Sequence, residues 1–236
     1  MKNSSAFAVV FGVALMGGTS LVFAGSLSGV VTLGVKAPPL KAIIIDKDQE
    51  VCGKERLNDK LILSKDMGIA NAVITIEGVT GGKKLEAPAK KIEFTQQKCE
   101  FRPHVLIIPK GAKIDVVNND PITHNIHTFA KKNTTINKAQ PASLKRFTSP
   151  KFEEAERIKV QCDIHRGLMS AWFLVVDSPY TVISDVNGKF NIPDVPPGTY
   201  KVEIWHEALG KEVKDVTITA GDTKLDVAMM PQQKKE

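Results

Sequence analysis

Short runs of alternating apolar and polar residues, separated by turn-forming residues, dominate the chain from residue 25 onward. Early runs occupy residues 30–33, 42–45, 61–63 and 72–76, with Gly, Pro, Asp and Lys between them. A period of two places alternate side chains on one buried face, and the β-branched residues in these runs favour extended backbone. Signals for helices are nearly absent. The pattern therefore predicts an all-β chain.

The same pattern divides the chain into three β-rich parts. Residues 25–92 form an N-terminal segment, which is either a small separate unit or an extension of the part that follows. Residues 93–177 end in the apolar strand AWFLVVD. After the short linker 178–180, residues up to 230 alternate between Asn-Gly, Pro-Pro-Gly and Ala-Gly-Asp turns, which predicts a small antiparallel β-sandwich with a polar tail at 231–236. A chain stopped near Asp177 is expected to keep the chemistry of the middle part.

Residues 1–24 are typical of an export signal. Lys2 begins it, residues 6–16 are apolar, and Val22-Phe23-Ala24 offers small residues for cleavage. The apolar run is shorter than the roughly 20 residues of a membrane-spanning helix, so an uncleaved anchor is the less favoured alternative. We expect a mature chain that begins at Gly25 and resides in the periplasm.

The formal net charge of +6 falls by one with the loss of Lys2. Nucleic-acid binding is not expected in an exported chain without aromatic residues interleaved among its basic ones. Weak steering toward an acidic redox partner is consistent with a mildly basic surface.

Four residues have the order and spacing of a mononuclear copper site: His124, Cys162, His165 and Met169. Two imidazoles and a thiolate in a plane, with a weak thioether on the axis, suit copper that changes oxidation state. Two residues separate Cys162 from His165, so a tight turn can bring both side chains to one ion. His124 follows an Asn-Asn-Asp-Pro turn at which a loop re-enters a strand.

Two further histidines are weaker candidates. His127 lies three residues after His124, so in a strand it points to the opposite face. His104 can either approach the edge of the site or hydrogen-bond a loop, and the sequence leaves both open.

The residues around these ligands resemble the cupredoxin family, plastocyanins and pseudoazurins in particular, over roughly residues 95–177. The resemblance lies in the Asn-rich turn that ends in His-Asn, the Cys-x2-His-x3-Met loop, and the hairpin FRPHVLIIPKGAKIDVVNND. It implies a Greek-key barrel, one type 1 copper ion, and His165 on an exposed loop as the site of electron exchange. Asn125 would hydrogen-bond across the site and stiffen it.

The sequence has three cysteines. If Cys162 binds copper, Cys52 and Cys99 remain available to pair with each other. In an oxidising compartment these two are expected to form a disulfide, the alternative being two free thiols.

The C-terminal part resembles the carboxypeptidase regulatory-like domain, a transthyretin-like β-sandwich, through the motifs Asp-x-Asn-Gly-x-Phe at 185–190 and Val-Pro-Pro-Gly-Thr-Tyr at 195–200. Trp205 is expected in the core, with stacking on a carbohydrate as the weaker alternative, and His206 on the surface. The three-part arrangement resembles exported bacterial proteins often labelled methylamine utilisation proteins, which indicates architecture and no substrate.

The function predicted from these features is single-electron transfer between periplasmic redox partners, without enzymatic activity. The alternatives are a periplasmic copper carrier or storage protein, a copper enzyme, and an envelope module that binds carbohydrate or protein. Storage proteins favour Met-rich or repeated His clusters, and multicopper oxidases need paired His-x-His motifs; the sequence has neither.

Overall fold

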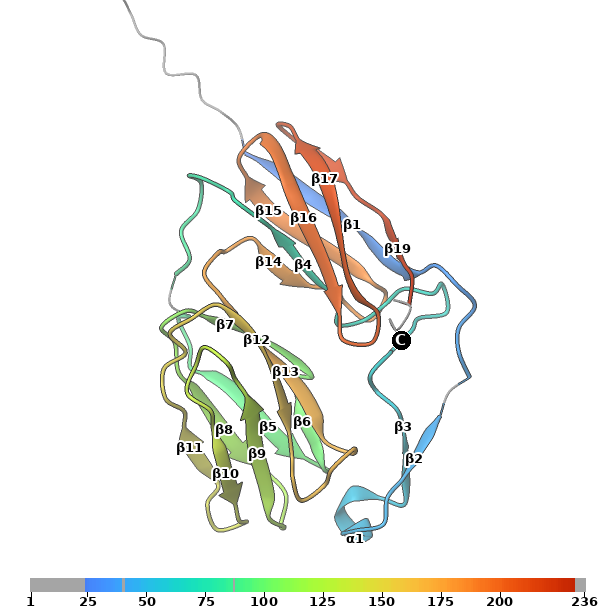
Figure 1. Ribbon diagram of the computed structural model, residues 1–236, viewed down its shortest axis with the longest axis vertical. Coiled ribbons are helices and arrows are strands. Elements are labelled where there is room, and N and C mark those ends of the chain that lie inside the picture. The colour runs from blue at the N-terminus through green and yellow to red at the C-terminus, as the bar shows by residue number, and fades with distance from the viewer. Residues whose placement is uncertain (1–23, 40, 87, 232–236) are drawn as a thin grey trace, which may run out of the picture.

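The computed structural model describes residues 24–39, 41–86 and 88–231. The predicted export signal, apart from Ala24, and residues 232–236 of the predicted tail lie outside this part. Figure 1 shows two β-rich bodies, with a separate small element beside the lower one. The single turn α1 (Gln49–Cys52) is the one helix among the described residues, so the predicted all-β class is confirmed. No helix in the described ranges has the length and hydrophobicity needed to cross a membrane.

The lower body consists of two packed sheets. One has the strand order β10-β9-β12-β13-β7 and the other the order β11-β8-β5-β6. The pairs β7–β13 and β5–β8 are parallel and the remaining pairs are antiparallel. These sheets form the predicted cupredoxin-like barrel. The strands are β5 (Ile92–Gln97), β6 (Glu100–Arg102), β7 (Val105–Pro109), β8 (Ile114–Asn118), β9 (His124–Phe129), β10 (Asn137–Gln140), β11 (Arg146–Thr148), β12 (Glu156–Gln161) and β13 (Ser170–Val176).

Alternate side chains along each strand point inward and fill the space between the two sheets. On β12, Ile158 and Val160 are buried while Lys159 between them is exposed. The ring of Phe173 meets that of Phe94 edge to face, with centroids 4.7 Å apart. Each fully buried side chain of this size contributes about 1.5–3 kcal/mol, so the two faces make a rigid support for the loops at the barrel's end.

The upper body is a sandwich that combines C-terminal and N-terminal strands. One sheet has the order β15-β1-β18, with β19 also paired to β1, and the other has the order β14-β4-β16-β17. Its strands are β1 (Gly25–Leu33), β4 (Val73–Ile76), β14 (Thr181–Ile183), β15 (Lys189–Val195), β16 (Gly198–His206), β17 (Gly210–Ile218), β18 (Asp222–Lys224) and β19 (Val227–Met229).

The N-terminal segment is therefore divided between the two bodies. Its strands β1 and β4 belong to the upper sandwich, whereas Ile45 and Cys52 pack in the core of the barrel. Leu27 and Val31 of β1 and Ile74 and Ile76 of β4 lie in one core with Ile192 and the other apolar residues of the C-terminal strands. Gly68 and Gly188 meet where the two parts cross: a Cβ on Gly68 would lie 2.0 Å from the carbonyl oxygen of Asn187. Strands more than 150 residues apart thus complete one sandwich.

The barrel and the sandwich share a buried apolar interface. Trp172 of β13 and Trp205 of β16 meet edge to face, with centroids 5.0 Å apart, among Val73, Val105 and Leu174. Glu207 accepts a hydrogen bond from Nε1 of Trp172 at 3.0 Å and pairs with Nε2 of His104. Of the two roles open to His104, the structure gives it the hydrogen-bonding one.

Two predictions for the end of β16 have different outcomes. Trp205 is buried in the interface, as expected for a core residue, and offers no open face to a carbohydrate. His206 is also buried, at 2% exposure, so its predicted surface position is wrong. Both faces of β16 are covered, because Val202 and Ile204 face the sandwich core while Trp205 faces the barrel.

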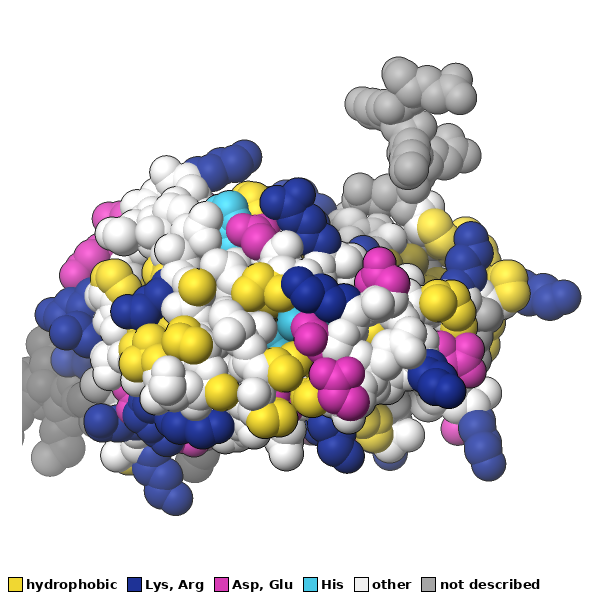
Figure 2. All heavy atoms as spheres, turned by 90° about the horizontal axis from the view of Figure 1, so that it is seen from below, with side chains coloured by type: hydrophobic (Ala, Val, Ile, Leu, Met, Phe, Trp, Pro, Cys, Tyr) yellow, Lys and Arg dark blue, Asp and Glu magenta, His cyan; other side chains and the backbone are white. Residues whose placement is uncertain are grey.

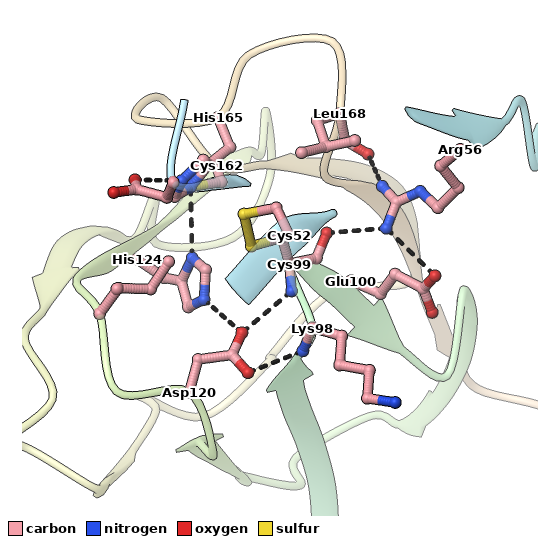
Figure 3. The surroundings of a disulfide bond; sticks show 12 residues. Cys52, Arg56, Lys98, Cys99, Glu100, Asp120, His124, Cys162, His165 and Leu168 are labelled. Atoms are coloured by element: carbon pink, nitrogen blue, oxygen red, sulfur yellow. Dashed lines mark hydrogen bonds and ion pairs between the residues drawn. A yellow bond between two sulfur atoms is a disulfide. The ribbon is translucent and has the colours of Figure 1, made fainter. Parts of the chain in front are cut away.

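Residues 42–57 form a small element at the end of the barrel, here called the cap. It comprises β2 (Ala42–Ile44), α1 and β3 (Glu55–Leu57), and its two strands pair only with each other within the described chain. The predicted disulfide between Cys52 and Cys99 is present and joins α1 to the β5–β6 turn (Figure 3). Because it closes a separation of 47 residues, loop entropy alone gives it a stabilising contribution of about 4 kcal/mol.

Arg56 fastens the other side of the cap. Its guanidinium donates to the carbonyl oxygens of Cys99 at 3.0 Å and Leu168 at 2.5 Å, and it lies 3.1 Å from the carboxylate of Glu100. One contact thus reaches the loop that carries the predicted copper ligands. The cap is held against the barrel by a covalent bond to the β5–β6 turn and by a largely buried cation that also reaches the ligand loop.

Candidate metal centre

The Asn-rich turn places His124 at the start of β9. Asn118 donates through Nδ2 to the carbonyl oxygens of Ile122 at 2.9 Å and Gln140 at 3.0 Å. Its Oδ1 accepts the backbone N–H of Asp120 at 3.0 Å. This side chain therefore shapes the turn from within, and the first residue of the following strand, His124, points into the barrel with no exposed surface.

A short loop between β12 and β13 carries the other three predicted ligands. The backbone N–H of Cys162 donates to the carbonyl oxygen of Met169 at 3.2 Å, which closes the base of the loop. The N–H groups of Leu168 and Met169 both donate to the carbonyl oxygen of His165 at 3.1 Å. Gly167 has φ +77°, where a side chain would be strained. These bonds turn His165 back toward Cys162, and Met169 is buried in the same core.

Three ligand atoms converge from these two segments. Nδ1 of His124 lies 3.3 Å from Nδ1 of His165, and Sγ of Cys162 lies 3.6 Å from Nδ1 of His165. All three atoms lie within 4.8 Å of one another, and the three residues are buried. Two imidazole nitrogens and one sulfur at this separation suit a single copper ion. Met169, which the sequence predicts as the weak fourth ligand, is buried in the same core. The residues present fit the metal that the spacing predicts.

Asn125 links the two segments as expected. Its backbone N–H donates to Sγ of Cys162 at 3.3 Å, and its Oδ1 accepts the N–H of Asp163 at 3.2 Å. Nδ2 donates to Oδ1 of Asn137 on the neighbouring strand at 3.0 Å. The thiol and the start of the ligand loop are thereby fixed relative to β9.

Each histidine of the site is also bonded to a carboxylate, which the sequence alone did not predict. Nε2 of His124 lies 2.7 Å from Oδ2 of Asp120 (Figure 3). Nε2 of His165 lies 2.9 Å from Oδ2 of Asp48. Asp120 stands four residues before His124, in the predicted turn. Asp48 comes from the cap, 117 residues from His165, and no local pattern indicates the contact. Such carboxylates orient a ligand and raise its basicity.

Burial and hydrogen bonding set the protonation of this site. Burial lowers the pKa of His124 more than the contact with Asp120 raises it, so the imidazole is neutral. Burial tends to raise the pKa of Asp120, but the N–H of Cys99 and the contact with His124 lower it overall, and the group is a carboxylate. The Nε2–H of His124 therefore donates to Asp120 and leaves Nδ1 free for a metal. Burial raises the pKa of the Cys162 thiol, so metal binding must release its proton.

His165 does not occupy the exposed position that the family resemblance implies. Its side chain is 1% exposed, because the carboxylate of Asp48 and the disulfide lie over it. Both sulfurs of the disulfide lie within 4.8 Å of a His165 nitrogen. Figure 2 views the end of the molecule nearest α1, where little histidine surface appears among hydrophobic, basic and acidic side chains. The expectation that His165 is exposed on its loop is therefore wrong.

His127 faces outward, as the alternation along β9 predicts. Its Nδ1 lies 2.8 Å from Oδ2 of Asp163, and its ring stacks on Phe129 with centroids 4.3 Å apart. Neither His127 nor His104 belongs to any group of potential ligands among the described residues.

Comparison with known families gives one match to part of the chain. The model for polysaccharide lyase family 4, domain II, matches residues 176–225. This is a different family from the carboxypeptidase regulatory-like domain that the turn motifs resemble. The match is confined to the C-terminal part. A comparison with curated proteins found no match.

Several solved structures are similar to part of this chain. A copper-containing nitrite reductase from Thermus scotoductus SA-01 is 18% identical over 41% of this chain and 26% of its own, with a TM-score of 0.34. A purple cupredoxin from Nitrosopumilus maritimus is 22% identical over 36% of this chain and all of its own, with a TM-score of 0.30. A mutant of amicyanin in the Cu(I) form is 18% identical over 44% of this chain and 98% of its own, with a TM-score of 0.33. This chain thus spans about a quarter of the nitrite reductase, and the likeness in each case concerns fold alone.

Proposed function

We propose that this chain is an exported type 1 copper protein that carries single electrons between periplasmic redox partners. The observation that carries the proposal is the convergence of Nδ1 of His124, Sγ of Cys162 and Nδ1 of His165 in a buried site. Bound there, copper would supply the change between Cu(I) and Cu(II). The protein would hold one ion through these residues and Met169, and it would act on no substrate of its own.

The surroundings of the site favour electron transfer because they restrain each ligand independently. Asn118 fixes the turn before His124, Asn125 fixes the thiol, and carboxylates hold both imidazoles. A site that cannot rearrange presents the same geometry to both oxidation states, so little reorganisation accompanies transfer. The disulfide and the predicted export signal both suit an oxidising compartment such as the periplasm.

A copper carrier or storage protein is the second candidate. Such a protein must exchange its ion, which favours ligands open to solvent or to a partner. Here Cys162 and His124 have no exposed surface, and the cap covers His165. For the other alternative, an envelope module that binds carbohydrate, burial of Trp205 removes the aromatic surface that suggested it.

Repeated redox cycling separates the first two functions. Protein loaded with one equivalent of Cu(II) would be reduced by ascorbate and reoxidised by hexacyanoferrate(III), with an excess of a Cu(I) chelator present throughout. We expect most of the visible absorbance to return in each cycle, because the buried ligands exclude the chelator. Transfer of the copper to the chelator on the first reduction would favour the carrier instead.

A second test concerns the carboxylate that the cap contributes. Asp48→Asn removes a negative charge but keeps an oxygen that accepts from His165, and Asn tolerates the φ of +53° at this position. Because the carboxylate favours Cu(II) over Cu(I), we expect the reduction potential to rise by tens of millivolts. About 59 mV corresponds to a tenfold change in the relative affinity for the two states.

Asp46→Asn is the matched control, since Asp46 is an exposed acid of the same cap with no contact to the site. Voltammetry of both copper-loaded variants would measure the shift. Equal shifts in the two variants, or none in Asp48→Asn, would show that the contact with His165 does not tune the metal.

A further inference from the structure

One outer surface of the barrel connects the predicted copper ligands with solvent. It consists of His127 and Phe129 on β9, Lys131 and Lys132 just after β9, and Lys159 on β12, and is here called the β9–β12 face. Phe129 and Lys159 are direct partners across the two strands, so their side chains share one side of the sheet. Phe129 is 42% exposed although it is a large aromatic residue.

A continuous chain of contacts leads from Cys162 to this face. Asp163 follows Cys162 in the sequence, and its carboxylate accepts a hydrogen bond from His127 at 2.8 Å. The His127 ring stacks on that of Phe129, with the planes 26° apart. Covalent bonds, a hydrogen bond and a ring stack therefore join the ligand loop to an exposed ring. Electrons tunnel more readily along such connected contacts than across gaps.

The cap covers the approach to the site over His165. Asp48 and the disulfide cover His165, and Arg56 fastens the cap to the backbone beside the ligand loop. A partner that approaches over the cap meets Asp48 and the disulfide before it reaches His165. A partner can reach the β9–β12 face without any movement of the cap.

The charge of the face indicates the kind of partner. Lys131, Lys132 and Lys159 are exposed, and none of them forms an ion pair within the described part of the chain. Phe129, Lys131 and Lys132 line a groove of about 500 Å³ between barrel and sandwich. Two acids on this groove are engaged: Glu156 accepts backbone N–H groups of residues 131–133, and Glu203 pairs with Arg157. Asp177 also lines it and is exposed.

We infer that electrons enter and leave through the β9–β12 face, and that this face docks a redox protein with an acidic surface. The inference rests on the proposed function and adds the location of the exchange and the charge of the partner. An exposed aromatic ring surrounded by unpaired lysines provides both a contact for transfer and long-range attraction for an anionic partner.

Oxidation of the Cu(I) protein by hexacyanoferrate(III) tests the route, with this anion standing in for the acidic partner. One electron passes from Cu(I), which becomes Cu(II), to the hexacyanoferrate, which becomes hexacyanoferrate(II). At low ionic strength we expect reversal of the three lysines of the face to glutamate to slow the reaction about tenfold or more, an effect that salt should diminish. Tris(phenanthroline)cobalt(III), a cation, should react faster with this variant. The reduction potential should be measured alongside, so that a change in driving force is separated from a change in docking.

The matched control is the same reversal at three exposed lysines in or directly beside the cap, Lys41, Lys47 and Lys54, which changes the net charge by the same amount. We expect little change there. If instead the cap variant slowed the reaction and the face variant did not, or if both slowed it equally, the assignment of the face would be overturned. If the wild-type protein did not bind copper or did not change its oxidation state, the proposed function itself would be contradicted. That result is distinct from one that contradicts only the assignment of the face.

Two further measurements keep the inference testable if the charge-reversal variant does not fold. Phe129→Ala should slow the reaction several-fold with the native potential retained, and Phe129→Trp should restore the rate. In the wild-type Cu(I) protein, the redox-inert paramagnetic anion hexacyanochromate(III) should broaden the amide signals of residues 127–132 and 159 before those of the cap. Unchanged rates in Phe129→Ala, or broadening confined to the cap, would contradict the inference.

Discussion

Cys162→Ser should abolish the intense visible colour of the Cu(II)-loaded protein and weaken copper binding by more than about 100-fold. Loss of a residue that only supports a ligand costs 10–100-fold in affinity, and Cys162 is itself the predicted thiolate. A serine hydroxyl does not ionise in this buried position and is a poor ligand for copper. Absorbance during Cu(II) titration and retention of copper against a chelator would measure both effects.

Met169→Leu is the control for this substitution, because Met169 is buried in the same core but is expected to bind only weakly. It should keep the colour and one copper ion per chain, with a raised reduction potential. Thermal unfolding of the metal-free proteins would show whether either substitution disturbs the fold. A Ser variant that kept the charge-transfer band would rule out Cys162 as the ligand.

A chain that ends at Asp177 should fail to accumulate as a folded monomer. This reverses the expectation from sequence, in which the C-terminal sandwich was dispensable. The truncation removes β14 to β19 and leaves β1 and β4 without partners, so Leu27, Val31, Ile74 and Ile76 lose their core. At about 1.5–3 kcal/mol for each buried side chain, the loss is on the order of 6–12 kcal/mol, which equals the whole stability of a typical domain.

Size-exclusion chromatography and limited proteolysis would follow the outcome. A chain that ends at Pro231 is the control, because it retains every described strand. Recovery of the chain ending at Asp177 as a monomer with the native copper spectrum would contradict the account, since it would show that the barrel folds independently of the sandwich.

The convergence of His124, Cys162 and His165 could be predicted because the residues that bring it about are close together in the sequence. Cys162, His165 and Met169 stand within one loop, and the turn before His124 is specified by adjacent Asn and Asp residues. Alternation along β9 correctly placed His127 on the outer face. The disulfide could be predicted because an oxidising compartment was expected and because Cys162 was assigned to copper, which left Cys52 and Cys99 as the only possible pair.

What could not be predicted depends on contacts between distant parts of the chain. The alternating pattern of β1 shows which side chains are buried but not that β15 is its partner. Nothing near Asp48 indicates that its carboxylate reaches His165, and nothing near His165 indicates that a cap covers it. The burial of His206 could not be predicted for the same reason. Both faces of β16 are covered only because the barrel packs against the sandwich.

His124, Cys162 and His165 should together bind one copper ion with Cys162 as a thiolate, and the visible absorption spectrum of the purified protein during titration with Cu(II) would measure this binding. We predict an intense blue or green charge-transfer band that rises linearly and stops at one equivalent. A spectrum with only weak bands at every copper concentration, or a band that continues to grow well beyond one equivalent, would contradict the account.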